Sequence, residues 1–251
     1  MAELTAVGYR PGRSFPHRLD PRVKLAAAAL FAFGAMGAGP SGLGLLAGAL
    51  LAGFLAARIS PLDLLADLRY FPMLLASVVL VRGWAVPGPP AFSAAGISFS
   101  EVGLREGALI AGRLGTVAAA GLLLVATTRI AAIRDAIVWL LRPVPGLPEG
   151  RVAVMLSLLI RFLPVILFRA RETGEAQRAR CVERRRNPVY RLRRFSVSLL
   201  RRVFLDADAL AVAMDARCYS DFRTPPIFRF TRSDGLALAL ASILAGFARM
   251  L

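Results

Sequence analysis

Long, uninterrupted apolar stretches dominate this sequence and give it a mean hydropathy of +0.60. In the hydrocarbon layer of a membrane every backbone polar group must be hydrogen-bonded within the protein, so stretches of about 17 to 25 apolar residues form helices there. We therefore predict an all-α fold, a polytopic transmembrane helical bundle of about five to six membrane segments. The expected apolar segments are Leu25–Gly39, a run that follows Gly42 and extends to Ala57, Tyr70–Val86, Glu106–Thr128, Val152–Phe168 and Gly235–Leu251.

The distribution of positive charge predicts which side of the membrane each part faces. Residues 10–24 carry five basic side chains, and residues 169–232 carry 16 arginines against 7 acidic residues, a net charge of +9. Cytoplasmic loops of membrane proteins are enriched in Lys and Arg, and no cleavable signal is apparent. We expect a multi-pass protein of the cytoplasmic membrane with its N-terminus inside. Its parts are a cytoplasmic leader (1–24), a membrane region (25–168), an arginine-rich cytoplasmic region (169–232) and a C-terminal membrane helix (233–251).

Several places within the apolar stretches leave alternatives open. Arg113 either snorkels to the interface or makes a polar contact inside the bundle. Ile130–Leu141 is too short to span a membrane comfortably, so the number of crossings around it is open. Arg161 and Pro164 interrupt the next run and suggest a kinked helix that descends into the cytoplasm. The short amphipathic piece that follows Pro61 is also expected to be cytoplasmic.

Rare residue types exclude several activities. Lys24 is the only lysine and does not lie in a Gly-rich phosphate loop, so this chain is not expected to bind ATP in that way. His17 is the only histidine, which argues against a zinc site and a Ser-His-Asp triad. The net charge of +16 suits a basic loop near anionic lipid or an acidic partner protein, and no nucleic acid partner is expected. We predict no catalytic residue, metal or cofactor in the chain itself.

The arginine-rich region contains a short internal repeat. Residues 176–181 and 213–218 both read Ala-x-x-Ala-Arg-Cys, and the two cysteines of the chain occupy the same place in each copy. Each copy follows helix-compatible sequence, so its alanines share one face and its arginine lies beside them. Small residues let another helix approach, and a guanidinium can form a two-pronged bond to a carboxylate. We interpret each copy as a close-packed helix end that offers an arginine to a partner.

With this repeat the sequence resembles the transmembrane (T) component of energy-coupling factor (ECF) ABC transporters, the EcfT, CbiQ and BioN family. That family has two cytoplasmic coupling helices that each end in Ala-Arg-Gly. The matching triplets here, which we call the coupling signatures, are Ala179-Arg180-Cys181 and Ala216-Arg217-Cys218. Further similarities lie in the leader between Tyr9 and Leu25, in Thr127-Thr128 and in Arg161-Phe162-Leu163-Pro164.

The resemblance implies a non-catalytic subunit. Its coupling helices would seat in grooves of two ABC ATPase subunits, identical or different, which bind the ATP. Its membrane helices would hold a small substrate-binding S component that carries a vitamin or a transition-metal ion. Arg180 and Arg217 would contact acidic groups on the ATPases. A self-sufficient channel or secondary transporter is the alternative class, although the apolar segments hold no convincing internal acidic residue.

Cysteine replaces the family's glycine in both signatures. Glycine tolerates a left-handed helix end that other residues rarely adopt. We therefore expect either a less tightly turned helix end, or an ordinary helical conformation at Cys181 and Cys218. Each cysteine is interpreted as a small residue that closes a helix end.

Overall fold

The computed structural model describes residues 12, 14–60, 70–94, 97–141, 149–182, 187–219 and 230–251. The chain divides into two compact units: unit 1 comprises Met1–Ile133 with Ile227–Leu251, and unit 2 comprises Arg134–Pro226. The amphipathic piece expected after Pro61 lies outside the described residues, as does the start of the leader at Tyr9.

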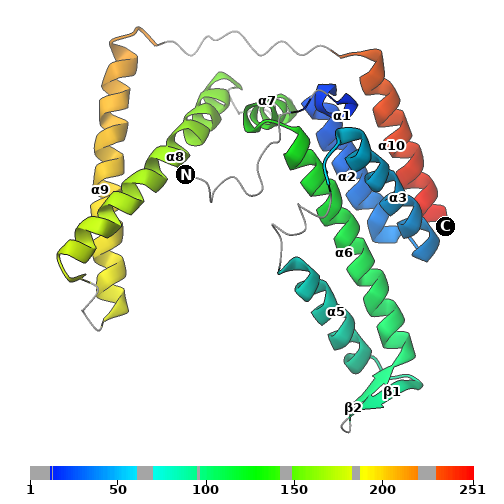
Figure 1. The fold of residues 1–251 in the computed structure, drawn as a ribbon. Coiled ribbons are helices and arrows are strands. Elements are labelled where there is room, and N and C mark those ends of the chain that lie inside the picture. The colour runs from blue at the N-terminus through cyan, green and yellow to red at the C-terminus, as the bar shows by residue number, and fades with distance from the viewer. Residues whose placement is uncertain are drawn as a thin grey trace. The chain divides into compact units, whose positions relative to one another are not determined.

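The described residues of unit 1 form a helical bundle with one short hairpin (Figure 1). The C-terminal helix α10 packs on α2 and α3, while α6 packs on α2, α3 and α5. The last helix of the chain therefore completes the bundle that the first helices begin. The elements are α1 (Phe15–Arg18), α2 (Pro21–Gly37), α3 (Pro40–Ala57), α5 (Phe71–Ala85), β1 (Pro90–Ala94), β2 (Ile97–Ser100), α6 (Glu101–Thr127) and α10 (Arg232–Met250).

Small residues allow the helices of unit 1 to pack at close range. A Cβ built on Gly42 of α3 would overlap the carbonyl oxygen of Ala248 in α10, and one built on Gly34 of α2 would lie 3.0 Å from Cα of Ala245. Leu46 and Ala248 are fully buried at this contact. Close packing through small residues is the usual basis of helix association in membranes, where no hydrophobic force holds helices together.

Four described helices are long and apolar enough to cross a membrane by length and composition: Pro40–Ala57, Glu101–Thr127, Val152–Ala179 and Arg232–Met250. The apolar helix α5 is shorter. Large apolar side chains on these helices are exposed, including Leu55, Met73 and Ile243. Exposed apolar surface of this kind is suited to contact with lipid or a membrane partner. The prediction of an all-α polytopic membrane protein is confirmed.

The structure shows two features of unit 1 that could not be predicted from the sequence. Arg113 donates from Nη2 to the carbonyl oxygen of Ala38, 3.0 Å away, so it makes the polar contact within the bundle. The antiparallel hairpin β1–β2 between α5 and α6 was not predicted, because its strands are short and β1 begins in a proline-rich segment.

Unit 2 consists mainly of α8 (Glu149–Ala179) and α9 (Pro188–Asp215), which pack against each other. The short helix α7 (Ile130–Leu141) leads from unit 1 into unit 2. Pro164 lies inside α8 without ending it, so the expected apolar run and the segment that leads to the first Ala-x-x-Ala-Arg-Cys copy form one continuous helix. The expected boundary between membrane and cytoplasmic regions at residue 169 therefore lies within a helix.

Candidate coupling-helix site

The two coupling signatures lie at the C-terminal ends of α8 and α9. Ala179 is the last residue of α8, and Arg180 and Cys181 form the turn that follows it. In the same way, α9 ends at Asp215, and residues 216–218 form the turn. All six residues of the two signatures are exposed. The two copies of the sequence repeat therefore occupy equivalent positions in the structure, each at the C-terminal end of a helix.

Both cysteines adopt the left-handed conformation, with φ of 55° at Cys181 and 51° at Cys218. The expectation of a looser end or an ordinary helical conformation was therefore wrong. At the end of α9 the Cys218 N–H donates to the Asp215 carbonyl at 3.0 Å, and the Tyr219 N–H donates to the Met214 carbonyl at 3.1 Å. This pair of hydrogen bonds satisfies helix carbonyls that would otherwise lack partners, and it requires a left-handed residue at Cys218.

The α8 end is closed in a similar way. The Cys181 N–H donates to the carbonyl oxygen of Arg178 at 2.9 Å. Arg58 after α3 is a third non-glycine residue with positive φ, at 56°. Tight helix ends without glycine therefore recur among the described residues, and cysteine holds the left-handed position at two of them.

Replacing Cys218 with glycine is expected to stabilise the end of α9 by about 1 kcal/mol, because glycine adopts the left-handed conformation without the steric cost of a Cβ. Hydrogen–deuterium exchange of the peptide that contains Tyr219 should then slow roughly fivefold. Cys218→Ala is the matched control: it removes the thiol, keeps the Cβ and should leave exchange unchanged. Equal slowing in both variants would show that the thiol sets the stability.

The arginines of the signatures differ from those at the helix crossing. Within the described part of the chain, neither Arg180 nor Arg217 forms an ion pair. Arg169 of α8, in contrast, contacts Glu172 and Asp206, each at 3.2 Å. A guanidinium at either signature could form a two-pronged hydrogen bond to a carboxylate.

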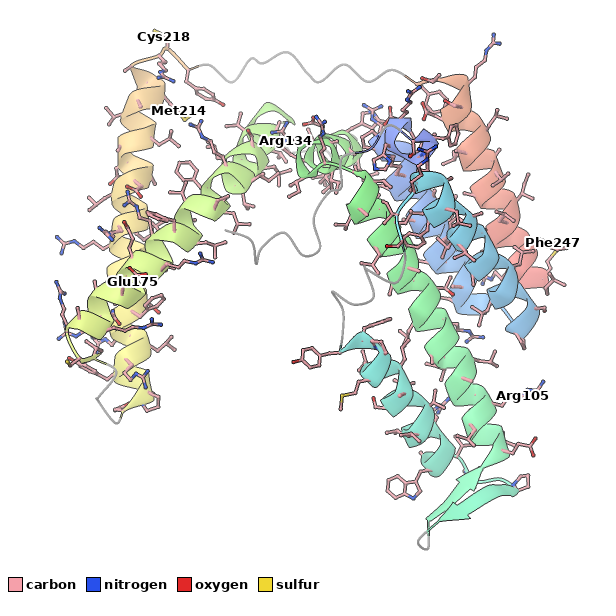
Figure 2. The ribbon with its side chains drawn as sticks, in the orientation of Figure 1. Arg105, Arg134, Glu175, Met214, Cys218 and Phe247 are labelled. Atoms are coloured by element: carbon pink, nitrogen blue, oxygen red, sulfur yellow. The ribbon has the colours of Figure 1, made fainter. Side chains whose placement is uncertain are left out.

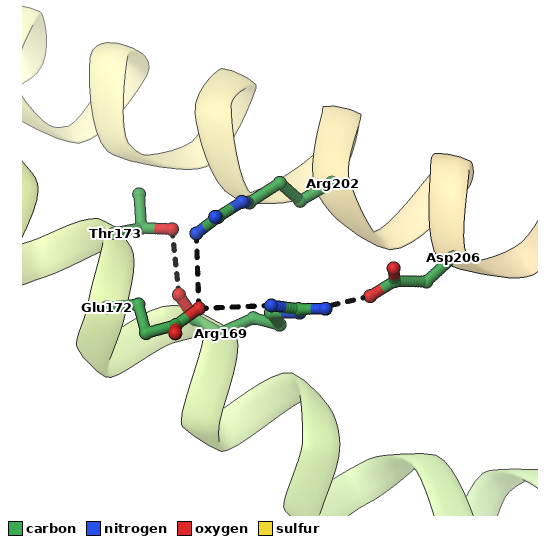
Figure 3. A network of polar contacts seen from close by, with 5 residues as sticks. All are labelled: Arg169, Glu172, Thr173, Arg202 and Asp206. Atoms are coloured by element: carbon green, nitrogen blue, oxygen red, sulfur yellow. Dashed lines mark hydrogen bonds and ion pairs between the residues drawn. The ribbon is translucent and has the colours of Figure 1, made fainter.

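An ion-pair network joins α8 to α9 where they cross (Figure 3). Arg169 bridges Glu172 of its own helix and Asp206 of α9, and Arg202 of α9 also reaches Glu172 at 3.2 Å. Thr173 donates to the Arg169 carbonyl at 2.7 Å. This network was not predicted from the sequence, because only the Arg169–Glu172 spacing is local. Pairs between α8 and α9 depend on how the helices cross.

The signatures lie at opposite ends of the α8–α9 pair, as the labelled residues Glu175 and Cys218 indicate (Figure 2). Since α9 starts soon after the first signature and has 28 residues, its rise separates the two by about 42 Å. The two signatures therefore form two separate contact points.

A cleft of about 480 Å³ lies beside the first signature, between the end of α8 and the start of α9. Basic side chains of Arg178 and Arg191 and apolar side chains of Val182, Leu192 and Phe195 line it. This mixture suits a partner segment that presents acidic and apolar groups together. Among the described residues no group of three or more His, Cys, Asp or Glu could hold a metal ion.

Comparison with known sequences identifies the family. The family model of the cobalt transport protein, CbiQ, matches residues 12–226. The chain belongs to the CbiQ family. It is similar to proteins named energy-coupling factor transporter transmembrane protein EcfT, and this supports a T component of an ECF transporter. Such T components are non-catalytic, so the prediction that the chain is not an enzyme is confirmed.

Two EcfT proteins illustrate the extent of the similarity. The protein of Heliobacterium modesticaldum is 31% identical over 226 residues, which cover 87% of this chain and 85% of the relative. The protein of Lacticaseibacillus paracasei is 30% identical over 271 residues, which cover 100% and 99%. The similarity to these T components thus extends over most or all of both chains.

One further relative is much longer than this chain. A putative ABC transporter ATP-binding protein of Bifidobacterium longum is 31% identical over 220 residues, which cover 84% of this chain. The chain spans only 28% of the length of that relative.

Proposed function

We propose that this T component couples two ABC ATPase subunits, identical or different, to a small substrate-binding S component in an ECF-type importer. The observation that carries the proposal is the pair of equivalent, exposed helix ends that hold Arg180 and Arg217. Two similar contact points about one long helix apart suit two similar partner subunits. The similarity to an ATP-binding protein of Bifidobacterium longum supports ATPase partners.

In the proposed contact each guanidinium forms a two-pronged hydrogen bond to a carboxylate on one ATPase. Ala179 and Ala216 let the ATPase surface approach closely. The left-handed cysteines end each helix directly after the arginine. The cleft beside Arg178 gives the first contact additional surface.

The ion-pair network of Arg169, Glu172, Arg202 and Asp206 supports joint movement of α8 and α9. Two helices joined at their crossing respond to a force at either end as one body. Closure of the ATPases would thus move both signatures together, and unit 2 would transmit that movement to the S component.

The remaining assignments follow from this role. ATP binds to the partner ATPases, and this chain holds no cofactor. The N-terminus and the coupling signatures face the cytoplasm, in accordance with the arginine excess of residues 169–232. The bilayer surrounds the apolar helices. The S component determines whether a vitamin or a transition-metal ion is transported.

Purification tests the proposal. A tagged copy of the chain, extracted from its native membrane in mild detergent, is expected to bring down ABC ATPase subunits and a small membrane protein, which mass spectrometry identifies. A chain that purifies alone and transports a substrate in liposomes without ATPases would support the channel or secondary transporter instead.

A further inference from the structure

A buried polar cluster in unit 1 lies where α2 begins, α6 ends and α10 begins. We call it the junction cluster, and it comprises Asp20, Lys24, Thr127, Thr231 and Asp234. Asp20, Thr127 and Asp234 are buried. Buried polar groups are costly unless they are hydrogen-bonded, so their partners require an explanation.

Lys24 joins the start of α2 to the end of α6. Its Nζ donates to the carbonyl oxygen of Thr127 at 3.0 Å and to that of His17 at 3.3 Å. Thr127 is the last residue of α6, where helix carbonyls lack intrahelical partners and the helix dipole favours a cation. The ammonium therefore fixes the α6 end to the leader.

Asp234 joins the start of α10 to the start of α2. Its Oδ1 accepts from the backbone N–H of Asp20 at 2.9 Å, and its Oδ2 accepts from that of Thr231 at 2.8 Å. A carboxylate in the first turn of a helix is also favoured by the helix dipole. Both oxygens of one buried side chain are thus used to hold two chain segments together.

The carboxylates of Asp20 and Asp234 stabilise the charged form of Lys24. Burial lowers the pKa of the Lys24 ammonium to about 8, while Asp234 and Asp20 oppose that shift. Removal of one carboxylate would leave the buried ammonium less well compensated.

The cluster also lies at both chain connections between the units. The chain enters unit 2 at Arg134, soon after Thr127, and it leaves unit 2 after Pro226, shortly before Thr231. These two connections are the covalent paths along which movement of unit 2 reaches unit 1. Both connections thus lie close in sequence to the same hydrogen-bonded group of residues.

We infer that the junction cluster is a positioning site of the transport cycle, which holds the two attachment points of unit 2 in fixed register with α2, α6 and α10. Movement of the coupling helices is then passed to the membrane helices. Without these hydrogen bonds the helix ends would shift by themselves, and the membrane helices would move less. The inference rests on the proposed coupling function.

Coupling stoichiometry in the full complex tests the inference. Complexes with Asp234→Asn or Lys24→Met, together with their ATPases and S component, are reconstituted in liposomes, and uptake per ATP hydrolysed is measured. We expect at least a tenfold lower ratio, with ATP hydrolysis and subunit recovery unchanged. Lys24→Arg, which retains a cationic donor for the two carbonyls, should restore most of the ratio.

Ser41→Ala is the matched control. It removes the hydrogen bond from Ser41 Oγ to the Leu251 carbonyl, 3.1 Å long, which holds the other end of α10. Its ratio should equal that of the wild type. A normal ratio in Asp234→Asn and Lys24→Met would overturn the inference, as would failure of both variants to assemble, which would indicate a purely structural cluster. If the wild-type chain purified without any ATPase subunit, that result would instead contradict the proposed function.

Discussion

The double variant Arg180→Glu with Arg217→Glu is expected to bind its ATPases at least about 100-fold more weakly and to lose transport, while it still inserts into the membrane. Loss of a desolvated charge pair at an interface costs about 2 to 5 kcal/mol, and reversal adds repulsion between the two carboxylates. Each single variant should show an intermediate loss, because the signatures lie at opposite ends of the α8–α9 pair. Affinity is measured as ATPase recovered per tagged chain, and transport as uptake by whole cells.

Arg193→Glu with Arg201→Glu is the matched control for this charge change. Both arginines are exposed on α9 and lie outside the signatures. The control should retain ATPases and transport within about twofold. Equal losses in both double variants would show that the overall positive charge of unit 2 matters, and not the two signature positions.

Gly42→Val is expected to lower the free energy of unfolding of unit 1 by about 3 kcal/mol or more, because the valine side chain would overlap the backbone of Ala248 in α10. The midpoint of thermal unfolding in detergent should fall by roughly 6 to 12 °C. A backbone atom cannot move aside in the way that a flexible side chain can, so α3 and α10 must separate.

Gly48→Val provides the comparison within the same helix, since a Cβ at Gly48 would meet nothing within 4 Å. Its unfolding midpoint should change little. A similar fall in both variants would attribute the effect to helix propensity, and the close contact between α3 and α10 would then not be the cause.

The membrane helices could be predicted because a hydrocarbon layer imposes the length and polarity of each segment. The apolar runs ending at Ala57 and beginning near Gly235 correspond to α3 and α10. Contacts between distant segments could not be predicted in this way. Asp20 and Asp234 are 214 positions apart, and no local periodicity indicates that they meet.

For the coupling signatures, the position could be predicted from the sequence but the backbone conformation could not. Their spacing placed each of them at a helix end, and the structure has helix ends there. Their backbone conformation was predicted wrongly, because left-handed φ is costly for a residue with a Cβ. The hydrogen bonds of Cys218 and Tyr219 to helix carbonyls oppose that cost, and they depend on the folded turn.

Crosslinking from the two native cysteines tests the coupling role most directly. Cys181 and Cys218 are the only cysteines of the chain, and both are exposed. In membranes that hold the assembled complex, a short thiol-to-amine crosslinker should join each of them to an ABC ATPase subunit. Variants that retain one cysteine, Cys181→Ser or Cys218→Ser, should each still form an ATPase adduct. The absence of both adducts in a complex that contains the ATPases would contradict the account.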